Sequence, residues 1–332
     1  MDLYDFTIIG GGPTGLFGAF YAGLRQMRTK VIDSLPQLGG QLSALYPEKY
    51  IYDVGGFPRV LAKDLVAQFA EQALQYSPTI CLSEKVVNLE RVGGETAQDG
   101  HLVITTEKGA VHYSKTVLIA AGVGAFMPRK MDIPDLDRLE GLGVHYFVTD
   151  PTTLADKHMV IVGGGDSAFD WAMALGPKAA SCLQIHRSDR FRAHEDSITK
   201  VLSLDSVEVK TFFELKALHG EEHLEAVTIF DNRSGEESTV PCNALLLNLG
   251  FLTNLGPIKG WGLEIEKNTI KVDSTMRTNI PGVYSAGDIC SYVGKLKLIA
   301  TGVGESGTAA NFAKTYLDPA AKAFPGHSSE QH

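Results

Sequence analysis

Two glycine-rich strings far apart in the chain carry the strongest chemical signal. One fits the pattern G-x-G-x-x-G at residues 10–15, and the other fits G-x-G-x-x-A at residues 163–168. A phosphate group needs backbone N–H donors that no side chain obstructs, and the start of a helix supplies them with the positive end of its dipole. Each string therefore predicts a phosphate cradle, meaning a tight turn and the helix start that follows it.

Each residue of a cradle has its own task. The first glycine permits the tight turn, the second lets the backbone approach a pyrophosphate, and the third small residue lets the helix pack closely on the strand. The predicted cradle residues are Gly10, Gly12, Thr14 and Gly15 in the first copy, and Gly163, Gly165, Asp166, Ser167 and Ala168 in the second.

The first cradle is followed by an acidic residue at the end of the next strand. Asp33 stands 23 positions after Gly10. A carboxylate at this place accepts hydrogen bonds from the free hydroxyls of an adenosine ribose and repels a 2′-phosphate. The pattern favours a dinucleotide with an unmodified ribose, such as FAD or NAD, and we expect FAD.

The second cradle has a basic segment at the equivalent place. His186 stands 23 positions after Gly163, and Arg187 and Arg192 follow it. Guanidinium groups form charge-assisted hydrogen bonds to phosphate, so the segment predicts contact with the 2′-phosphate of NADP(H). The alternative is an ordinary solvated basic loop, but its position after a cradle favours the nucleotide.

Two similar strand–helix–strand units must position these residues. The first is strand 4–9, helix 14–24 and strand 30–32, and the second is strand 158–162, helix 167–175 and strand 182–186. Apolar β-branched runs and glycine turns support both. The sequence further predicts helices at 62–76 and 306–316, an antiparallel excursion at 79–92 and 102–119, and strands at 207–213, 224–231 and 244–249.

The predicted fold class is α/β, with two Rossmann-like, three-layer ββα domains. The FAD domain is predicted to be discontinuous, at residues 1–121 and 251–332 with a loose tail at 318–332, and the NADP(H) domain is expected at 122–250. A chain of 332 residues is long enough for two cores.

Composition narrows the function. The net charge of −9 argues against nucleic acid as a partner. The apolar stretch 6–24 follows an acidic start and contains a glycine turn, so we predict neither a signal peptide nor a membrane span, and a cytoplasmic location. The four cysteines form no CxxC pair or zinc-ligand spacing, and no metal site is expected.

Several motifs beyond the cradles resemble thioredoxin reductase. They are Gly39-Gly40-Gln41-Leu42, the segment 163–168, His186-Arg187 with Phe191-Arg192-Ala193, and Ser285-Ala286-Gly287-Asp288. Thioredoxin reductases carry a redox-active CxxC before the second cradle, and here the segment 144–151 holds no cysteine. Without a dithiol, electrons cannot pass to a disulfide by thiol exchange.

The chain is more similar to the thioredoxin-reductase-like ferredoxin–NADP reductases, along nearly its whole length. The shared motifs are segments 36–42, 45–50, 144–147 and 249–251, and a tail beyond the last helix. The resemblance implies FAD contacts by Asp33, Gln41, Tyr46, Val86 (through its backbone), Phe126 and Asp288.

The same resemblance implies that aromatic rings cover both faces of the flavin. Tyr50 would stack on one face and His327 on the other, with Ser329 near the ring edge and the tail supplied across a homodimer. Other interpretations stay open: Tyr50 as an ordinary half-buried aromatic, His327 as part of a frayed terminus, and Asp288 as a cap or turn residue.

The expected activity is hydride transfer between NADPH and FAD, followed by one-electron transfer to or from ferredoxin or flavodoxin. No side chain stands out as an acid, base or nucleophile, so Tyr50 and His327 are the only predicted catalytic residues. Two alternatives are a reductase of another acceptor, such as a disulfide protein or a quinone, and a non-catalytic NADP(H)-sensing flavoprotein.

Overall fold

The chain divides into two compact units. In the computed structural model, the first unit consists of Met1–Phe126 and Thr253–His332. The second unit consists of Met127–Leu252. The structure describes residues 2–122, 125–146, 148 and 150–323, without the side chains of 125–128 and 251–254. The divisions fall inside two paired strands, β9 (Ala125–Pro128) and β18 (Phe251–Asn254).

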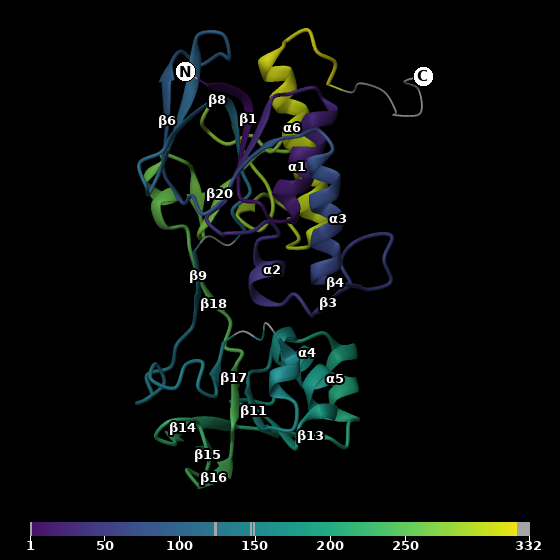
Figure 1. Ribbon diagram of the computed structural model, residues 1–332, viewed down its shortest axis with the longest axis vertical. Helices are drawn as coiled ribbons and strands as arrows, with labels where there is room; N and C mark the ends of the chain where they lie inside the picture. The colour runs from purple at the N-terminus through teal and green to yellow at the C-terminus, as the bar shows by residue number, and fades with distance from the viewer. Residues whose placement is uncertain (1, 123–124, 147, 149, 324–332) are drawn as a thin grey trace. The chain divides into compact units, whose positions relative to one another are not determined.

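The first unit is built on a seven-stranded sheet (Figure 1). Its parallel part contains β5 (Thr79–Cys81), β2 (Thr29–Ile32), β1 (Leu3–Ile9), β8 (Val111–Ile119) and β21 (Val283–Ser285). β6 (Val86–Gly93) and β7 (Gly100–Thr106) extend it antiparallel from β8. The predicted antiparallel excursion is therefore present from Val86 onward, whereas Thr79–Cys81 pairs parallel with β2.

Three helices of the first unit pack side by side, with α1 (Pro13–Leu24) in contact with both α3 (Ala62–Leu74) and α6 (Ile299–Leu317) (Figure 1). The face that α1 buries is made of small residues, including Gly18, Ala19 and Ala22. Small side chains let neighbouring helices and the sheet approach closely, and α1 is buried on more than one side.

The prediction of a helix starting at Ser306 was wrong, because α6 begins at Ile299. Its first two turns contain Gly302 and Gly304 together with β-branched residues, a composition of low helix propensity. A Cβ at Gly302 would lie 2.4 Å from Thr14 Oγ1. The glycine is therefore required by the close approach of α6 to α1, which the local sequence does not reveal.

The first unit also contains shorter elements. They are α2 (Gln41–Leu45), the antiparallel pair β3 (Tyr50–Ile51) and β4 (Val60–Leu61), and a small sheet of β19 (Ile265–Glu266), β20 (Thr269–Lys271) and β22 (Cys290–Ser291).

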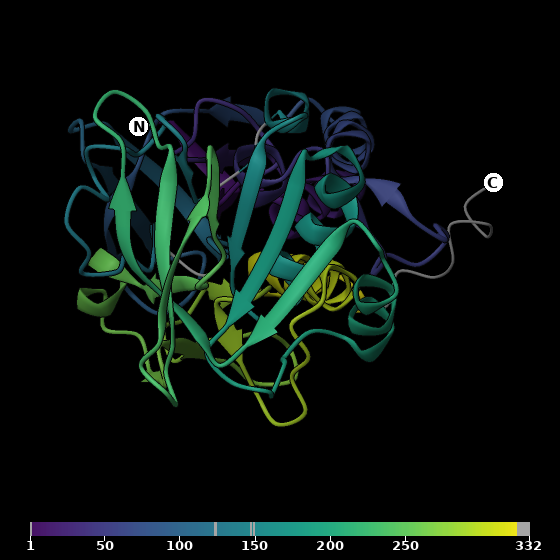
Figure 2. The same cartoon turned by 90° about the horizontal axis from the view of Figure 1, so that it is seen from below.

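The second unit repeats the architecture with a five-stranded parallel sheet, shown side by side in Figure 2. The order is β10 (Val144–His145), β17 (Ala244–Leu247), β11 (His158–Val162), β12 (Ser181–His186) and β13 (Val207–Thr211). The helices are α4 (Asp166–Leu175) and α5 (Glu195–Leu202), and the antiparallel strands are β14 (Phe213–His219), β15 (Ala226–Asp231) and β16 (Glu237–Pro241).

One strand predicted at 207–213 is divided in two. Phe212 has φ +66°, in the left-handed region, and it separates β13 from β14. The guanidinium of Arg233 lies over the Phe212 ring, 4.0 Å from its centroid. The chain therefore turns from the parallel sheet into the antiparallel one at this residue.

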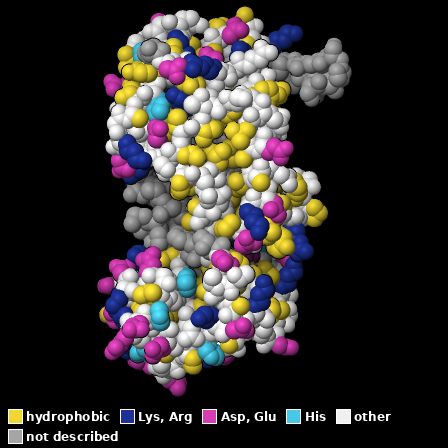
Figure 3. Space-filling model, in the orientation of Figure 1, with side chains coloured by type: hydrophobic (Ala, Val, Ile, Leu, Met, Phe, Trp, Pro, Cys, Tyr) yellow, Lys and Arg dark blue, Asp and Glu magenta, His cyan; other side chains and the backbone are white. Residues whose placement is uncertain are grey.

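Each unit has its own apolar core. Charged side chains of both signs lie on the surface of each unit (Figure 3). Every helix in the described part of the chain is too short or too polar to span a lipid bilayer.

We expect Gly15→Ala to destabilise the protein. A Cβ at Gly15 would lie 1.9 Å from the carbonyl oxygen of Gly10, a backbone atom that cannot swing aside. Overpacking of this kind costs about 1–3 kcal/mol, measurable as a lower unfolding free energy in urea. Gly55→Ala is the control, because nothing lies within 4 Å of its added Cβ. Equal stability of the two variants would contradict the packing argument.

Candidate functional site

The first cradle is formed by two glycine turns that face each other. Gly10 has φ +113°, and a Cβ there would lie 2.4 Å from the carbonyl oxygen of Ala120. The N–H of Gly39 donates to the carbonyl of Gly11 at 2.8 Å, and Gly40 has φ +57°. A Cβ at Gly12 would meet nothing closer than Gly40 Cα at 3.9 Å. The backbone of this turn is therefore open to a ligand.

The start of α1 is not capped by a side chain. Gly12 is the N-cap residue, and Pro13, which has no N–H, occupies the first helical position. The first N–H groups of a helix have no partner within the helix, so they remain available to an anion here.

Asp33 lies beside this helix start and is only 7% exposed. Its Oδ2 accepts from the N–H of Gly11 at 2.5 Å, and its Oδ1 accepts from the N–H of Leu35 at 2.7 Å. Burial raises the pKa of Asp33, and these two hydrogen bonds oppose the shift. A carboxylate has about four acceptor sites, so the fixed group keeps capacity for hydroxyls.

The strand that carries Val86 is joined to the same place. The N–H of Ser83 donates to the carbonyl of Leu35, and the N–H of Glu84 donates to the carbonyl of Asp33, both at 2.9 Å. Val86 itself is buried at the start of β6. Backbone hydrogen bonds therefore connect the segments that carry Asp33 and Val86, the two residues predicted to contact the adenosine part of FAD.

Tyr46 and Asp288 form a second group. Burial, and then the charges of Asp288 and Asp53, raise the pKa of Tyr46 to about 12. Asp288 is half-buried, and its pKa is also raised, first by burial and then by Glu305 and Asp53, against the opposing effect of Lys297 and Lys295. Among the described residues no hydrogen bond to the Asp288 carboxylate is found, which leaves it available to ligand hydroxyls.

Asp53 is a residue that sequence reasoning missed. Its Oδ2 accepts from the N–H of Ile299 at 2.7 Å, and its carbonyl accepts from the N–H of Ala300 at 3.2 Å. Asp53 thus caps α6 from a distant segment, in the absence of a cap from Leu298. This contact holds the Tyr50 segment against the helix start, and only a long-range fold could reveal it.

Tyr50 stands at the edge of this region. Its side chain is 42% exposed, and the Arg59 guanidinium lies 4.7 Å from its ring centroid. The residues that follow Tyr50 in the chain, 52–58, line an open hollow of about 600 Å³ together with Leu298 and Ala300. The Gln41 side chain lies next to Gly122, since a Cβ added at Gly122 would be 3.1 Å from Gln41 Nε2.

Three predicted residues cannot be compared with the structure. The side chain of Phe126 and the tail residues His327 and Ser329 lie outside the described part. The described start of the tail, residues 318–323, forms no helix or strand and makes two hydrogen bonds through backbone carbonyls to side chains of the first unit. The carbonyl of Lys322 accepts from Arg25 Nη2 at 3.0 Å, and the carbonyl of Ala323 accepts from Asn311 Nδ2.

The second cradle is closed by different neighbours. A Cβ at Gly163 would lie 2.6 Å from the carbonyl oxygen of Asn248, and one at Gly164 would lie 2.6 Å from the ring of His186. Nothing lies within 4 Å of the position of a Cβ at Gly165, the uncapped start of α4. Ala168 is fully buried against the turn. The backbone at Gly165 is thus open.

The basic segment folds back onto this turn. The N–H of Arg192 donates to the carbonyl of Gly164 at 2.7 Å, and His186 Nε2 donates to the carbonyl of Arg190 at 3.2 Å. Asn232 Nδ2 donates to the carbonyl of Arg187 at 2.9 Å. In the described chain, the exposed side chains of Arg187 and Arg192 have no hydrogen bond or ion pair. Their guanidinium groups are available beside the cradle.

His186 lies under these cations. Burial lowers its pKa, and the charges of Arg187 and Arg192 lower it further, although the Arg190 carbonyl opposes the shift. The neutral imidazole packs on Gly164 and Phe191 and carries no positive charge. The positive charge beside the cradle therefore comes from the two arginines.

The cradle residues Asp166 and Ser167 differ in their surroundings. Asp166 Oδ1 accepts from the N–H of His194 at 2.9 Å, so its carboxylate connects the start of α4 to the segment before α5. Ser167 is exposed in the first turn of α4.

Comparison with known proteins agrees with this pair of cradles. Residues 4–307 match the family model described as pyridine nucleotide-disulphide oxidoreductase. A ferredoxin–NADP reductase of Geobacillus thermodenitrificans is 53% identical over 99% of this chain and 97% of its own. A ferredoxin–NADP reductase 2 of Shouchella clausii is 53% identical over 99% and 98%. The chain belongs to this oxidoreductase family, among relatives named ferredoxin–NADP reductase.

Solved structures of family members share the fold. The thioredoxin reductase of Lactococcus lactis superposes with a TM-score of 0.82 at 25% identity, covering 95% of this chain and 99% of that one. The thioredoxin reductase of T. acidophilum gives 0.82 at 23% identity, covering 97% and 100%. The predicted α/β class with two Rossmann-like domains is confirmed.

The cysteines support no dithiol chemistry. Cys81, Cys182, Cys242 and Cys290 are unpaired, and burial raises the pKa of each thiol. No group of three or more metal-binding side chains occurs within the described ranges.

We expect Asp53→Ala to lower the unfolding free energy by about 0.5–2 kcal/mol, because the N–H of Ile299 loses its cap and the helix dipole loses a favourable charge. Urea unfolding measures the change. Asp53→Asn is the matched variant, because an amide oxygen can still accept this bond and a smaller loss is expected. If the two variants lose the same stability, capping by the side-chain oxygen is not the cause.

Proposed function

We propose that the chain is an FAD-dependent ferredoxin–NADP reductase, which transfers hydride between NADPH and FAD and single electrons to or from ferredoxin or flavodoxin. One observation carries the proposal: the equivalent strand ends are acidic beside the first cradle and basic beside the second. This contrast suits two different nucleotides in one chain. The full-length similarity to relatives named ferredoxin–NADP reductase supports the same activity.

The residues of the first unit fit FAD. The uncapped start of α1 would bind the pyrophosphate, Asp33 the adenosine ribose, and the unpartnered Asp288 the ribityl hydroxyls. We further assign the flavin half to Gln41, Tyr46, Phe126 and the stacking residue Tyr50, and the adenine to the Val86 backbone. Bound FAD supplies the ability to accept a hydride and to exchange electrons singly.

The residues of the second unit fit NADP(H). Gly165 and the uncapped start of α4 would bind the pyrophosphate, and Arg187 and Arg192 the 2′-phosphate. Neutral His186 would pack behind the phosphate turn. The chain's own task is to bind, orient and exclude water, because hydride transfer needs the reacting atoms about 3–3.5 Å apart.

The two other functions are less well supported. A disulfide reductase of the thioredoxin reductase type needs a dithiol, and segment 144–151 contains no cysteine. The transfer experiment below separates ferredoxin or flavodoxin from a quinone or another acceptor. A non-catalytic nucleotide sensor has no need of a Tyr50 segment held against α6 through Asp53.

A homodimer with an exchanged tail is part of the proposal. Asn311 binds the carbonyl of Ala323, and it lies about 18 Å along α6 from Ile299. The four residues from Ala323 to His327 span at most about 14 Å. We therefore favour His327 and Ser329 acting on the flavin of a second copy. A cytoplasmic location stays a prediction.

We expect Arg187→Ala and Arg192→Ala each to weaken NADPH use about tenfold or more, because each loses a charge-assisted hydrogen bond. The KM for NADH should change little. Arg190→Ala is the matched control, since that exposed arginine of the same segment acts through its backbone carbonyl on His186. Equal effects on NADPH and NADH would contradict the 2′-phosphate assignment.

The electron path is tested by stopped-flow mixing. The purified protein should be yellow, NADPH should reduce it rapidly, and reduced protein should pass electrons to added ferredoxin. Rapid reduction without transfer to ferredoxin or flavodoxin, but with transfer to a quinone or thioredoxin, would favour the other reductases. NADPH binding without flavin reduction would favour the sensor.

A further inference from the structure

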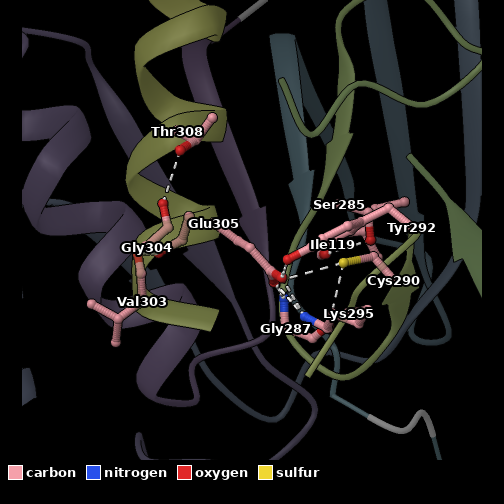
Figure 4. A network of polar contacts seen from close by, with 11 residues as sticks. Ile119, Ser285, Gly287, Cys290, Tyr292, Lys295, Val303, Gly304, Glu305 and Thr308 are labelled. Atoms are coloured by element: carbon pink, nitrogen blue, oxygen red, sulfur yellow. Dashed lines mark hydrogen bonds and ion pairs between the residues drawn. The ribbon is translucent and has the colours of Figure 1, made fainter. Parts of the chain in front are cut away.

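The buried carboxylate of Glu305, on the second turn of α6, gathers donors from one loop. It accepts from the N–H of Gly287 at 2.8 Å, from Tyr292 OH at 2.6 Å, and from Lys295 Nζ at 2.5 and 2.6 Å. Figure 4 shows Glu305 pointing from the helix into this group. Cys290 Sγ donates to the same carboxylate at 3.7 Å, so groups from four residues of this loop donate to Glu305.

The ion pair between Lys295 and Glu305 is almost fully buried. The side chains are 7% and 4% exposed, far less than the other lysine–acid pairs of the described chain. Removing two charges from water costs more than a typical buried pair recovers, and apolar residues of similar volume are often as stable. Stability alone therefore does not explain the choice of these two residues.

Glu305 and Lys295 hold the loop between β21 and α6 near both of its ends, because Glu305 binds Gly287 at one end and Lys295 at the other. Gly287, with φ +82°, directly precedes Asp288, and Lys295 is close to the start of α6 at Ile299. Cys290 Sγ, in the middle, contacts the carbonyl of Gly287 at 3.3 Å. One carboxylate therefore fixes both the turn that presents Asp288 and the entry into α6.

We propose that Glu305 and Lys295 are positioning residues, which hold Asp288 toward the ribityl chain of FAD and keep the charge behind the flavin site balanced. The inference rests on the proposed FAD site and goes beyond it, because neither residue is assigned to the cofactor. Glu305 acts through Gly287 and Lys295 acts through Glu305, so neither needs to touch FAD.

Charge balance gives the pair a distinctive signature. A reduced flavin carries more electron density than an oxidised one, so an unpaired cation nearby favours reduction and an unpaired anion opposes it. Glu305→Gln keeps the shape and leaves Lys295 unpaired, whereas Lys295→Met leaves Glu305 unpaired. The double variant restores neutrality.

The experiment measures the flavin midpoint potential of the FAD-loaded protein by chemical reduction, without NADPH or ferredoxin. We expect the potential to rise in Glu305→Gln, to fall in Lys295→Met, and to return near the starting value in the double variant. Shifts of the same sign in both single variants, or none, overturn the charge role.

A second measurement does not depend on bound flavin. Amide hydrogen exchange across residues 287–295 of the FAD-free protein should be faster in both single variants. Unchanged exchange overturns the positioning role.

The control is Glu107→Gln, in an exposed pair with Lys85 at 3.3 Å, which should change neither measurement. Comparable shifts in this variant would show that any lost charge has the same effect and would overturn the proposal. If the protein reduces no ferredoxin, the proposed function fails separately, because neither measurement uses ferredoxin. If it binds no FAD, the proposed function fails, and the hydrogen-exchange measurement still tests whether the pair holds the loop.

Discussion

The structure depends on the close approach of a helix start to a strand end, which occurs twice. In the first unit Gly15 lies so near the Gly10 carbonyl that no side chain fits between them. In the second, the helix residue is Ala168, and its Cβ would lie 3.1 Å from a Cβ added at Gly163. Because the two segments touch, the open N–H groups of α1 and α4 project from the ends of β1 and β11, where a phosphate can reach them.

Nucleotide choice follows from what stands next to those N–H groups. Asp33 is buried and fixed by two backbone donors, so it offers hydrogen-bond acceptors and no room for another anion. Arg187 and Arg192 are fixed only through their backbone, which leaves the guanidinium groups exposed. The same fold thus selects differently through the side chains that follow the second strand of each unit.

The flavin side of the first unit depends on α6 in addition to α1. Asp53 caps the start of α6, and Glu305 on the next turn ties down the loop that carries Asp288. Glu305 accepts from backbone, hydroxyl and lysine donors, and Asp53 accepts from the backbone N–H of Ile299. Asp288, by contrast, keeps its acceptors, and this difference separates a structural carboxylate from one suited to a ligand.

The sequence by itself determined both cradles, their order along the chain and the acidic–basic contrast between them, because these features depend on residues within one strand–turn–helix segment. It misplaced the start of α6, since Gly302 and its β-branched neighbours disfavour a helix locally and become acceptable only against Thr14. It gave no sign of Asp53 as a cap or of the Lys295–Glu305 pair. Asp53 meets its partner 246 positions away, so only the tertiary structure could bring the two together.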